Sequence, residues 1–441
     1  MKHCFLLLFL LLPIDLYATR VFSDLPAMDI QDMFQAGKAK YVLRYPHHFN
    51  DTLTIPEGSV LVFDGGSLNG PIKFHYTFLK GKVNLKGSSI SGIITNKSFD
   101  ASWLCAMDGV TDDAPRINEM IEVCGDVFFP KGNYRLISTF NSIGSLPKGF
   151  YPSVQGHIAI CKGNVTLEGE QGATFITDKP TVTLCVFSKP YDIEHSIANI
   201  RIENIIFEVH NDGVNFHEFM HTIKLIGVNG ITINNCTFND FWGDAICLSH
   251  YGDTPETGER TRNQNVKILN NTIIGGDHHN NRNGISVING KNVLIKGNVI
   301  KNTSRKDMPG GIDVEPNNCA YTIENIRIEN HVFEEIRGSG GAICVVAFND
   351  GPAHKVSIIN NKIYNSNNGI LLYVKTKGTT DGFLVKGNYV DRNTNPYRFI
   401  GSGASKNWTI SGNTFDRPCK QNIPGQITVN NLTVKKNKKK V

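Results

Sequence analysis

The octapeptide VKILNNTI, which begins at Val266, is repeated with small changes along the chain. Similar octapeptides begin at Val293 (VLIKGNVI), Ile326 (IRIENHVF) and Val356 (VSIINNKI), and further copies begin at residues 165, 200, 231, 383 and 408. Consecutive copies are 25 to 35 residues apart. Positions one and three are apolar, a period of two that predicts a β-strand. Units this small cannot bury an apolar face alone, so the repeat predicts a solenoid of stacked coils.

Positions five and six of the octapeptide predict a bend that recurs in every coil. Position five is Asn or Gly, the residues that best tolerate a positive φ. Position six is Asn in five copies, at Asn271, Asn298, Asn361, Asn388 and Asn413. Parallel coils stack ~4.8 Å apart, so these side chains are expected to form a ladder of amide hydrogen bonds. Of the 46 asparagines, 37 follow residue 200, and we assign this excess to structure.

A second strand pattern follows each bend, beginning at residues 222, 245, 284, 311, 342 and 369. Its second and fourth residues are always aliphatic, as at Ile312 and Val314, and are expected to face the interior. Its third and fifth residues are then expected to face outward. The predicted fold class is all-β, a right-handed parallel β-helix.

Residues 108–113 read DGVTDD and residues 129–134 read FPKGNY. An amphipathic segment between them predicts a short helix that Gly125 ends. Its apolar face comprises Ile117, Met120, Ile121 and Cys124. This combination resembles the opening of the pectate-lyase-like β-helix superfamily, in which the helix covers the N-terminal end of the solenoid. The resemblance covers about residues 100–420 and implies the fold, whereas activities in the superfamily vary. The preceding β-rich segment is similar to exported β-helix proteins of glycan-degrading Bacteroidetes.

The 441 residues divide into four predicted segments. A basic start, an apolar run over residues 5–12 and a small residue at Ala18 predict a secretory signal peptide over residues 1–18. An N-terminal β segment over 19–100, the β-helix over 101–425 and a mobile Lys-rich tail over 426–441 should follow. No later segment approaches the ~20 apolar residues of a membrane span. We therefore expect an exported protein, periplasmic or secreted, without a membrane span.

The charge of the chain gives little indication of a partner. The net charge is +5, and the five lysines of residues 435–440 account for all of it, since 5 − 5 = 0. A neutral solenoid gives no reason to expect a nucleic-acid partner. None of the ten cysteines lies in a CxxC pair, so zinc and dithiol chemistry have no support. We expect neither a metal nor another cofactor.

Two carboxylates stand out among the outward positions of the second strand pattern. Asp313 and Glu315 are two residues apart on one strand, which places their Cα atoms roughly 6.6 Å apart. That spacing allows carboxyl separations of about 5 to 9 Å, the range of retaining and inverting glycosidases. Their repulsion would raise one pKa, as a general acid requires, and Gly310 and Gly311 would let a ligand approach the backbone. We predict that Asp313 and Glu315 are catalytic, and a solvated surface pair is the alternative.

Polar residues on the same and neighbouring coils are the candidates for substrate binding. The loop over residues 275–283 would project one coil before Asp313, and its side chains could bind sugar hydroxyls or a carboxylate. The predicted substrate-binding residues are Lys224, Asp244, His250, His278, His279, Arg282 and Tyr373.

These residues favour a carbohydrate-active enzyme whose partner is a polysaccharide or oligosaccharide. The leading hypothesis is a glycoside hydrolase that uses Asp313 and Glu315. A polysaccharide lyase on a uronic-acid polymer is the second hypothesis, with Lys224, His279 or Arg282 as the base. A non-catalytic, glycan-binding or structural β-helix is the third. The sequence leaves the sugar, the linkage and the oligomeric state open.

Overall fold

The computed structural model describes residues 20–140, 155–188, 197–252, 254–347, 351–392, 395–415, 429–435 and 437–439. The predicted signal peptide, residues 1–18, lies outside these ranges. The chain forms two compact units that divide between Asn96 and Lys97. Within the described ranges, no helix is long and apolar enough to cross a bilayer.

The first unit consists of short parallel strands and one helix, α1 (Ile30–Phe34). Alternation along its strands buries every second side chain, as at Leu61 and Phe63. Its six-stranded sheet contains β1 (Val21–Ser23), β2 (Lys40–Leu43), β4 (Leu53–Thr54), β5 (Val60–Phe63), β7 (Pro71–Gly81) and β8 (Ser89–Ile94). A further pair contains β3 (Pro46–His48) and β6 (Ser67–Asn69).

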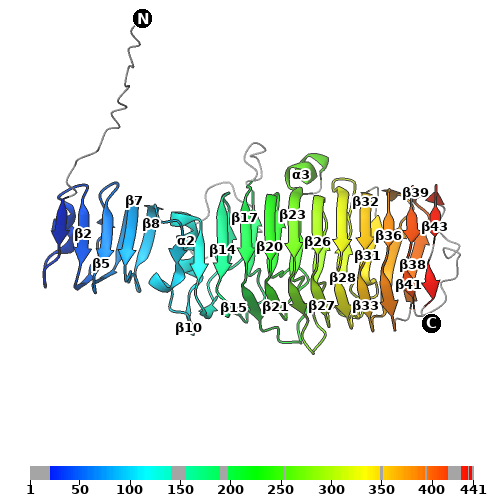
Figure 1. The fold of residues 1–441 in the computed structure, drawn as a ribbon, viewed down its shortest axis with the longest axis horizontal. Coiled ribbons are helices and arrows are strands. Elements are labelled where there is room, and N and C mark those ends of the chain that lie inside the picture. Colours follow the sequence, from blue (N-terminus) through cyan, green and yellow to red (C-terminus); the bar gives the residue numbers. More distant parts are fainter. Residues whose placement is uncertain are drawn as a thin grey trace, which may run out of the picture. The chain divides into compact units, whose positions relative to one another are not determined.

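The second unit is a right-handed parallel β-helix, as predicted, and its strands stack side by side in Figure 1. Most coils contribute one strand to each of three parallel sheets. Each octapeptide spans two of these strands rather than one. In VKILNNTI the first strand ends at Leu269, Asn270 has a φ of 53°, and the next strand starts at Thr272. The second predicted strand pattern forms the third sheet.

The described residues of the second unit give sheets of fifteen, twelve and nine strands. The fifteen-stranded sheet contains β9 (Phe99–Asp100), β11 (Val127–Phe129), β14 (Val165–Gly169), β17 (Ile200–Glu203), β20 (Asn229–Asn234), β23 (Asn263–Leu269), β26 (Gly290–Lys296), β29 (Ile323–Glu329), β32 (Pro352–Ile359), β35 (Thr379–Asp381), β36 (Leu384–Lys386), β39 (Ala404–Lys406), β40 (Thr409–Ser411), β42 (Val429–Asn430) and β43 (Thr433–Lys435). The twelve-stranded sheet contains β10 (Asp108–Asp112), β12 (Gly132–Arg135), β15 (Ala173–Thr177), β18 (Ile206–Val209), β21 (Thr237–Asn239), β24 (Thr272–Ile274), β27 (Val299–Lys301), β30 (Val332–Glu334), β33 (Lys362–Tyr364), β37 (Tyr389–Asp391), β41 (Thr414–Phe415) and β44 (Lys438–Lys439). The nine-stranded sheet contains β13 (Ile158–Ile160), β16 (Leu184–Phe187), β19 (Ile223–Ile226), β22 (Ile246–Leu248), β25 (Ile285–Val287), β28 (Gly310–Val314), β31 (Gly341–Ala347), β34 (Asn368–Val374) and β38 (Asn395–Gly401).

The Lys-rich segment differs from the mobile tail that we predicted. Its described residues form β42, β43 and β44, which pair in parallel with β39, β40 and β41. Apolar residues such as Val434 are too few there to give a strong strand pattern. Backbone pairing with the preceding coil extends the sheets in spite of the lysines.

The helix predicted after DGVTDD is α2 (Ala114–Cys124). Gly125 ends it with a φ of 85°, and its N–H donates to the carbonyl of Ile121 at 2.9 Å. The helix packs against β11 and β13, strands at the N-terminal ends of their sheets. Val123 is more deeply buried than the predicted Cys124. Two further helical segments are η1 (Ala101–Trp103) and α3 (Pro255–Arg260), which lies outside the stacked strands in Figure 1.

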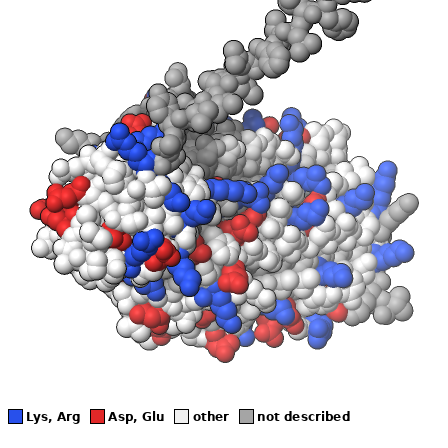
Figure 2. Space-filling model, turned by 60° about the vertical axis from the view of Figure 1, so that its left-hand side comes forward, with Lys and Arg blue, Asp and Glu red and all other residues white. Residues whose placement is uncertain are grey.

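Stacking brings equivalent side chains of successive coils into contact. In the interior, the ring of Phe207 lies 5.7 Å from that of Phe175 and 5.0 Å from that of Phe238, between centroids. On the surface, in-register residues of adjacent coils carry opposite charges, as in the ion pair of Lys291 with Glu324 at 3.1 Å. Figure 2 accordingly shows basic and acidic side chains mixed over the face that it presents.

The predicted asparagine ladder is confirmed and lies inside the coil bends. The backbone N–H and the side-chain amide of Asn271 both donate to Oδ1 of Asn298, at 2.8 and 2.9 Å. The same arrangement joins Asn361 to Asn388 and Asn388 to Asn413. All five predicted asparagines are buried. Each rung satisfies a backbone N–H that the bend removes from the sheets.

His331 replaces asparagine in the middle of this ladder. The ring Nδ1 of His331 accepts the backbone N–H of Asn298 at 3.0 Å. The backbone N–H of His331 donates to Oδ1 of Asn361, also at 3.0 Å. Its Nε2 lies 2.9 Å from the carbonyl oxygen of Ile295 and therefore carries the proton. Burial lowers the pKa of His331 to about 4. A proton on Nδ1 would remove the acceptor of the Asn298 N–H.

We predict that His331→Asn makes the protein less sensitive to acid. A histidine whose pKa falls from 6.5 to about 4 on folding contributes stability above pH 6.5 that is lost as the pH falls toward 4. The loss amounts to about 3 kcal/mol, and asparagine, which does not titrate, would avoid it. Urea unfolding at a series of pH values measures the difference. His210→Asn, at an exposed histidine, is the control, and equal acid sensitivity of His331→Asn and wild type would contradict the prediction.

Candidate functional site

The outward positions of the nine-stranded sheet hold the predicted carboxylates, but most of this face is covered. Cys247, Ser286, Asp313 and Cys344 are in register on four adjacent strands, and all four are buried. Loop residues cover part of this face, since Tyr321 packs in one cluster with Cys247. The alternative of a solvated acidic pair is wrong for Asp313, whose exposure is 0%.

Gly310, at the start of β28, lets the backbone of the next coil approach closely and does not make room for a ligand. A Cβ at this position would lie 1.7 Å from the carbonyl oxygen of Gly341 in the next coil. At Gly311 it would lie 2.7 Å from the carbonyl oxygen of Ala342. The expectation that these glycines admit a ligand is therefore corrected, because the neighbouring coil fills the space.

Asp313 and Glu315 form a hydrogen-bonded pair of carboxyl groups. They are thus in direct contact and not separated as a glycosidase acid and base would be. Burial, followed by the charge of Glu315, raises the pKa of Asp313 well above its usual range. Burial also raises the pKa of Glu315, which is only partly covered and reaches the surface.

Asp313 keeps its proton to higher pH than Glu315 does, because burial and the neighbouring carboxyl group raise its pKa more strongly. Among the described residues, no N–H or O–H group donates to its Oδ1, while Oδ2 lies 3.5 Å from the side-chain amide of Asn283. A protonated Oδ1 that donates to Glu315 satisfies both groups. The same Asn283 amide donates to Ser286 Oγ at 3.0 Å, and its oxygen accepts the N–H of Gly310 at 2.8 Å. Asn283 thereby fixes the start of β28 relative to the preceding coil.

Arg282 is the cation of the site. Its Nη1 donates to both carboxylate oxygens of Asp244, at 2.9 Å each, and to Ser286 Oγ at 3.2 Å. Its Nε lies 3.4 Å from Oε1 of Glu218. Burial alone would raise the pKa of Asp244, but Arg282 and His221 outweigh it and hold that pKa far below its usual value. Asp244 therefore remains ionised and keeps Arg282 beside the Asp313–Glu315 pair.

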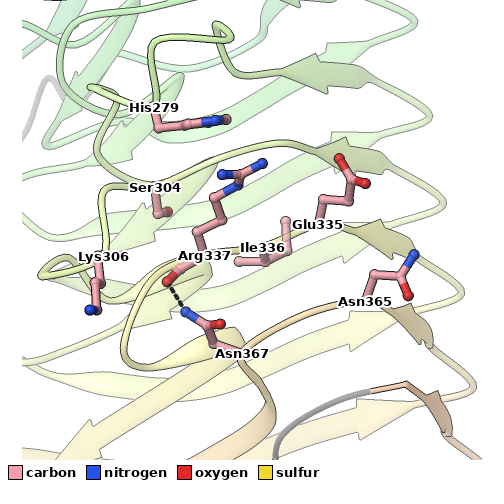
Figure 3. Close-up of a pocket in the computed structure, with 8 residues that line it drawn as sticks. All are labelled: His279, Ser304, Lys306, Glu335, Ile336, Arg337, Asn365 and Asn367. Atoms are coloured by element: carbon pink, nitrogen blue, oxygen red, sulfur yellow. Dashed lines mark hydrogen bonds between the residues drawn. The ribbon is translucent and has the colours of Figure 1, made fainter.

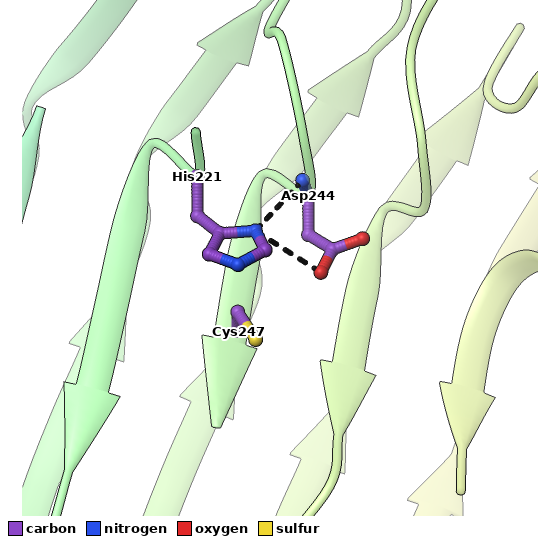
Figure 4. Close-up of side chains that lie close together, drawn as sticks. All are labelled: His221, Asp244 and Cys247. Atoms are coloured by element: carbon purple, nitrogen blue, oxygen red, sulfur yellow. Dashed lines mark hydrogen bonds and ion pairs between the residues drawn. The ribbon is translucent and has the colours of Figure 1, made fainter. Parts of the chain in front are cut away.

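His221, Asp244 and Cys247 are buried and lie close together (Figure 4). Nδ1 of His221 accepts the backbone N–H of Asp244 at 3.1 Å and lies 3.2 Å from its carboxylate. These are metal-ligand types, with ligand atoms within 4.8 Å of one another. However, Arg282 already donates to both oxygens of Asp244, and burial raises the pKa of the Cys247 thiol. The cluster fits a hydrogen-bonded support for Arg282 better than a metal site.

Other predicted binding residues lie away from the carboxyl pair. His278 is tied to Asp240 at 2.9 Å and holds its own loop. His279 lines a separate hollow. His250 packs against the ring of Tyr321, with centroids 4.1 Å apart.

Two candidates remain on the nine-stranded sheet. Lys224 is half-buried on β19 and is in register with Cys247. Tyr373, on β34, lines a hollow of about 710 Å³ together with Lys375. We call this the Tyr373 hollow. Lys375 Nζ lies 5.7 Å from the Tyr373 ring centroid, and its charge acts to lower the pKa of Glu315 against the effect of burial. By register, Tyr373 lies two coils beyond Glu315.

Sequence reasoning missed Glu218 and Lys375. Glu218 belongs to an irregular loop before β19, and its side chain is 42% exposed beside Arg282. Its only signal in the sequence is its place between two histidines, His217 and His221. Lys375 directly follows β34 and has no periodic signature.

Comparison with known proteins concerns the architecture. No family model matches the chain, and no match was found among curated proteins. The surface adhesin PfbA of Streptococcus pneumoniae is 14% identical, with a TM-score of 0.43, over 78% of this chain and 93% of that one. The catalytic unit of a GH87 α-1,3-glucanase from Streptomyces thermodiastaticus is 13% identical over 92% and 64%, with a TM-score of 0.38. The tailspike of Acinetobacter baumannii phage AM24 is 13% identical over 78% and 54%, with a TM-score of 0.47. These likenesses concern the fold alone.

We predict that Asp313→Asn gains stability relative to wild type as the pH rises. A carboxyl group whose pKa is raised on folding contributes stability at low pH that is lost as the pH rises through the raised pKa. Asparagine cannot ionise and can still donate to Glu315. Unfolding free energies measured from mildly acidic to alkaline pH test this sign. Asp307→Asn is the control, because Arg305 lowers the pKa of this exposed carboxylate, and a similar gain there would contradict our assignment.

Proposed function

We propose that this protein is an exported carbohydrate-active enzyme, a glycoside hydrolase in which Glu315 is the general acid. The observation that carries the proposal is the Asp313–Glu315 pair, in which one carboxyl group is buried and the other reaches the surface. Buried polar groups with raised pKa values next to a fixed cation are costly to fold, and they concentrate at functional sites. The partner is a polysaccharide or oligosaccharide.

In this proposal Glu315 touches the substrate, and Asp313 acts only through its contact with Glu315. The raised pKa of Glu315 favours the protonated form that a general acid needs at mildly acidic pH. Glu315 would give its proton to the glycosidic oxygen as the bond to the sugar breaks. Asp313 is a positioning residue that donates its own hydrogen bond to the carboxylate that forms. Arg282 lies close enough to stabilise that negative charge.

Glu218 is our candidate for the second carboxylate of the reaction. Hydrolysis by two carboxyl groups needs one to protonate the leaving oxygen and another to activate water or attack the sugar. Asp313 is buried and cannot reach a sugar, whereas Glu218 is half-exposed and lies 3.4 Å from Nε of Arg282. The second role therefore moves from Asp313, where the sequence suggested it, to Glu218.

The Tyr373 hollow supports an oligosaccharide that lies along the stack of coils. Val346 lies one coil beyond Glu315, and Tyr373 is in register with Val346 in the coil after that. Two coil steps separate Glu315 from Tyr373, a distance of ~10 Å. A half-buried tyrosine ring next to a cation and hydroxyl groups is a suitable surface for a sugar ring. Elimination has less support from Arg282, which Asp244 keeps protonated, and from His279, which lines a separate hollow. Lys224 is the remaining candidate base for that reaction.

We predict that Glu315→Gln and Glu218→Gln each lower kcat on the cognate glycan by about 10²–10⁴-fold, since each removes one proton transfer. Release of reducing ends from a panel of neutral and acidic glycans measures hydrolysis. Unsaturated uronate products, detected by their ultraviolet absorbance, would instead indicate a lyase. Glu324→Gln, at a carboxylate on the fifteen-stranded sheet, is the matched control. Full turnover by folded Glu315→Gln would overturn the assignment. If the wild-type protein bound a glycan but released no product from it, a non-catalytic role would be favoured.

The pH profile separates a positioning role of Asp313 from a merely structural one. Activity should fall as the pH rises through the pKa of Glu315, because the acid must be protonated. The hydrogen bond from Asp313 acts to lower that pKa. Asp313→Ala should therefore move the alkaline limb of kcat to higher pH, while Asp313→Asn, which retains a donor, should leave it nearly in place. Identical limbs in both variants would refute this role.

A further inference from the structure

A second hollow lies over the turns that lead from the twelve-stranded to the nine-stranded sheet (Figure 3). We call it the turn hollow. Its volume is about 580 Å³, within the range of small-molecule sites. Its lining comes from the segments that follow β24, β27, β30 and β33, so four consecutive coils contribute to it. None of these residues takes part in the proposed hydrolysis.

The turn hollow contains charges without ion-pair partners. In the described part of the chain, no acidic group lies within 4.0 Å of Lys306 or Arg337, and no basic group lies within that distance of Glu335. By contrast, Lys301 and Glu334, just outside the hollow, form an ion pair at 2.9 Å. In Figure 3 the side chain of Arg337 extends between His279 and Glu335. Unneutralised charges gathered in a concave site are typical of ligand recognition.

The backbone at Glu335 adds a second observation. Its φ is 57°, a left-handed conformation that costs a residue other than Gly or Asn roughly 1–2 kcal/mol. The two adjacent coils carry Asn302 and Asn365 at this turn, with φ values of 50° and 49°. Glutamate thus occupies a position for which asparagine is better suited. The turn places the Glu335 carboxylate at the wall of the hollow.

His279 is strained in the same way and has an unused nitrogen. Its φ is 56°, and its Nδ1 is buried with no hydrogen-bond partner among the described residues. Burial lowers the pKa of His279, which favours the neutral ring with one donor and one acceptor. Asn365 and Asn367 add amide groups on the opposite side in Figure 3.

We infer that the turn hollow binds a uronic acid residue, a sugar ring that carries one carboxylate. Arg337 and Lys306 supply the cations that hold the carboxylate, and a guanidinium can bind it through two parallel hydrogen bonds. Glu335, His279 and the two amides supply acceptors and donors for ring hydroxyls. A simple inorganic anion fits less well, because Glu335 would repel it while offering no compensating bond.

Titration of the full chain with D-glucuronate and D-galacturonate tests the inference, with D-glucose and D-galactose as the neutral counterparts. At least one uronate should bind tenfold or more tightly than its neutral parent, and its affinity should fall as salt is raised. Arg337→Gln and Lys306→Gln should each weaken uronate binding at least tenfold. Lys301→Gln, just outside the hollow, should leave it unchanged.

Glu335→Gln separates a sugar acid from a plain anion. Loss of the carboxylate should weaken uronate binding and strengthen the binding of inorganic sulfate. Equal affinity for uronates and neutral sugars, or unchanged uronate binding by folded Arg337→Gln, would overturn the inference. So would sulfate that binds wild type as tightly as the uronate does.

The inference is independent of the proposed hydrolysis, and the test keeps the two apart. Glu315→Gln, which should lose turnover, should retain the wild-type affinity for the uronate. If turnover disappears in Glu315→Gln while no uronate binds wild type, only the turn hollow is misassigned. If uronate binds as expected while Glu315→Gln keeps full turnover, only the catalytic proposal fails.

Discussion

The structure depends on one constraint, the stacking of equivalent residues on successive coils. Parallel strands repeat at ~4.8 Å, so whatever occupies one position meets its counterpart in the next coil. Apolar positions become columns such as Phe175, Phe207 and Phe238. Asparagines become a ladder that replaces the hydrogen bonds lost at each bend. The side chains that do not repeat, such as Asp313, face neighbours that have no matching group.

The raised pKa of Asp313 follows from its place among side chains that do not match it. Ser286 and Cys344 flank Asp313 in the adjacent coils, and neither can neutralise a charge. Burial between them raises the pKa of Asp313 and so favours the protonated form, which can donate to Glu315. Asp244 holds Arg282 in place, because Nη1 of Arg282 donates to both of its carboxylate oxygens. The site therefore keeps a neutral acid and a fixed cation side by side.

Sequence periodicity predicted the solenoid, the bends and the ladder, because each depends on local patterns that recur. The helix α2 was predicted from a single amphipathic segment that Gly125 ends. Periodicity also identified Asp313, Glu315, Asp244 and Arg282 as unusual residues within the recurring patterns. It could not predict that the outward face is covered, since loop conformations have no period. Glu218 and Lys375 were missed for the same reason. The separation of the carboxyl groups was mispredicted because Cα spacing does not determine how two side chains turn toward each other.

The contact between Gly310 and Gly341 has a further consequence for how such a protein can change. Coil spacing beneath the carboxyl pair is set by backbone against backbone, with no side chain that could adapt. The strands therefore keep a fixed spacing, whereas the loops that carry His279 and Lys306 are free to vary in length and composition. New glycan preferences could arise by exchange of loops while the buried acid stays in place. Engineering of this scaffold would accordingly begin with its loops and leave its glycines untouched.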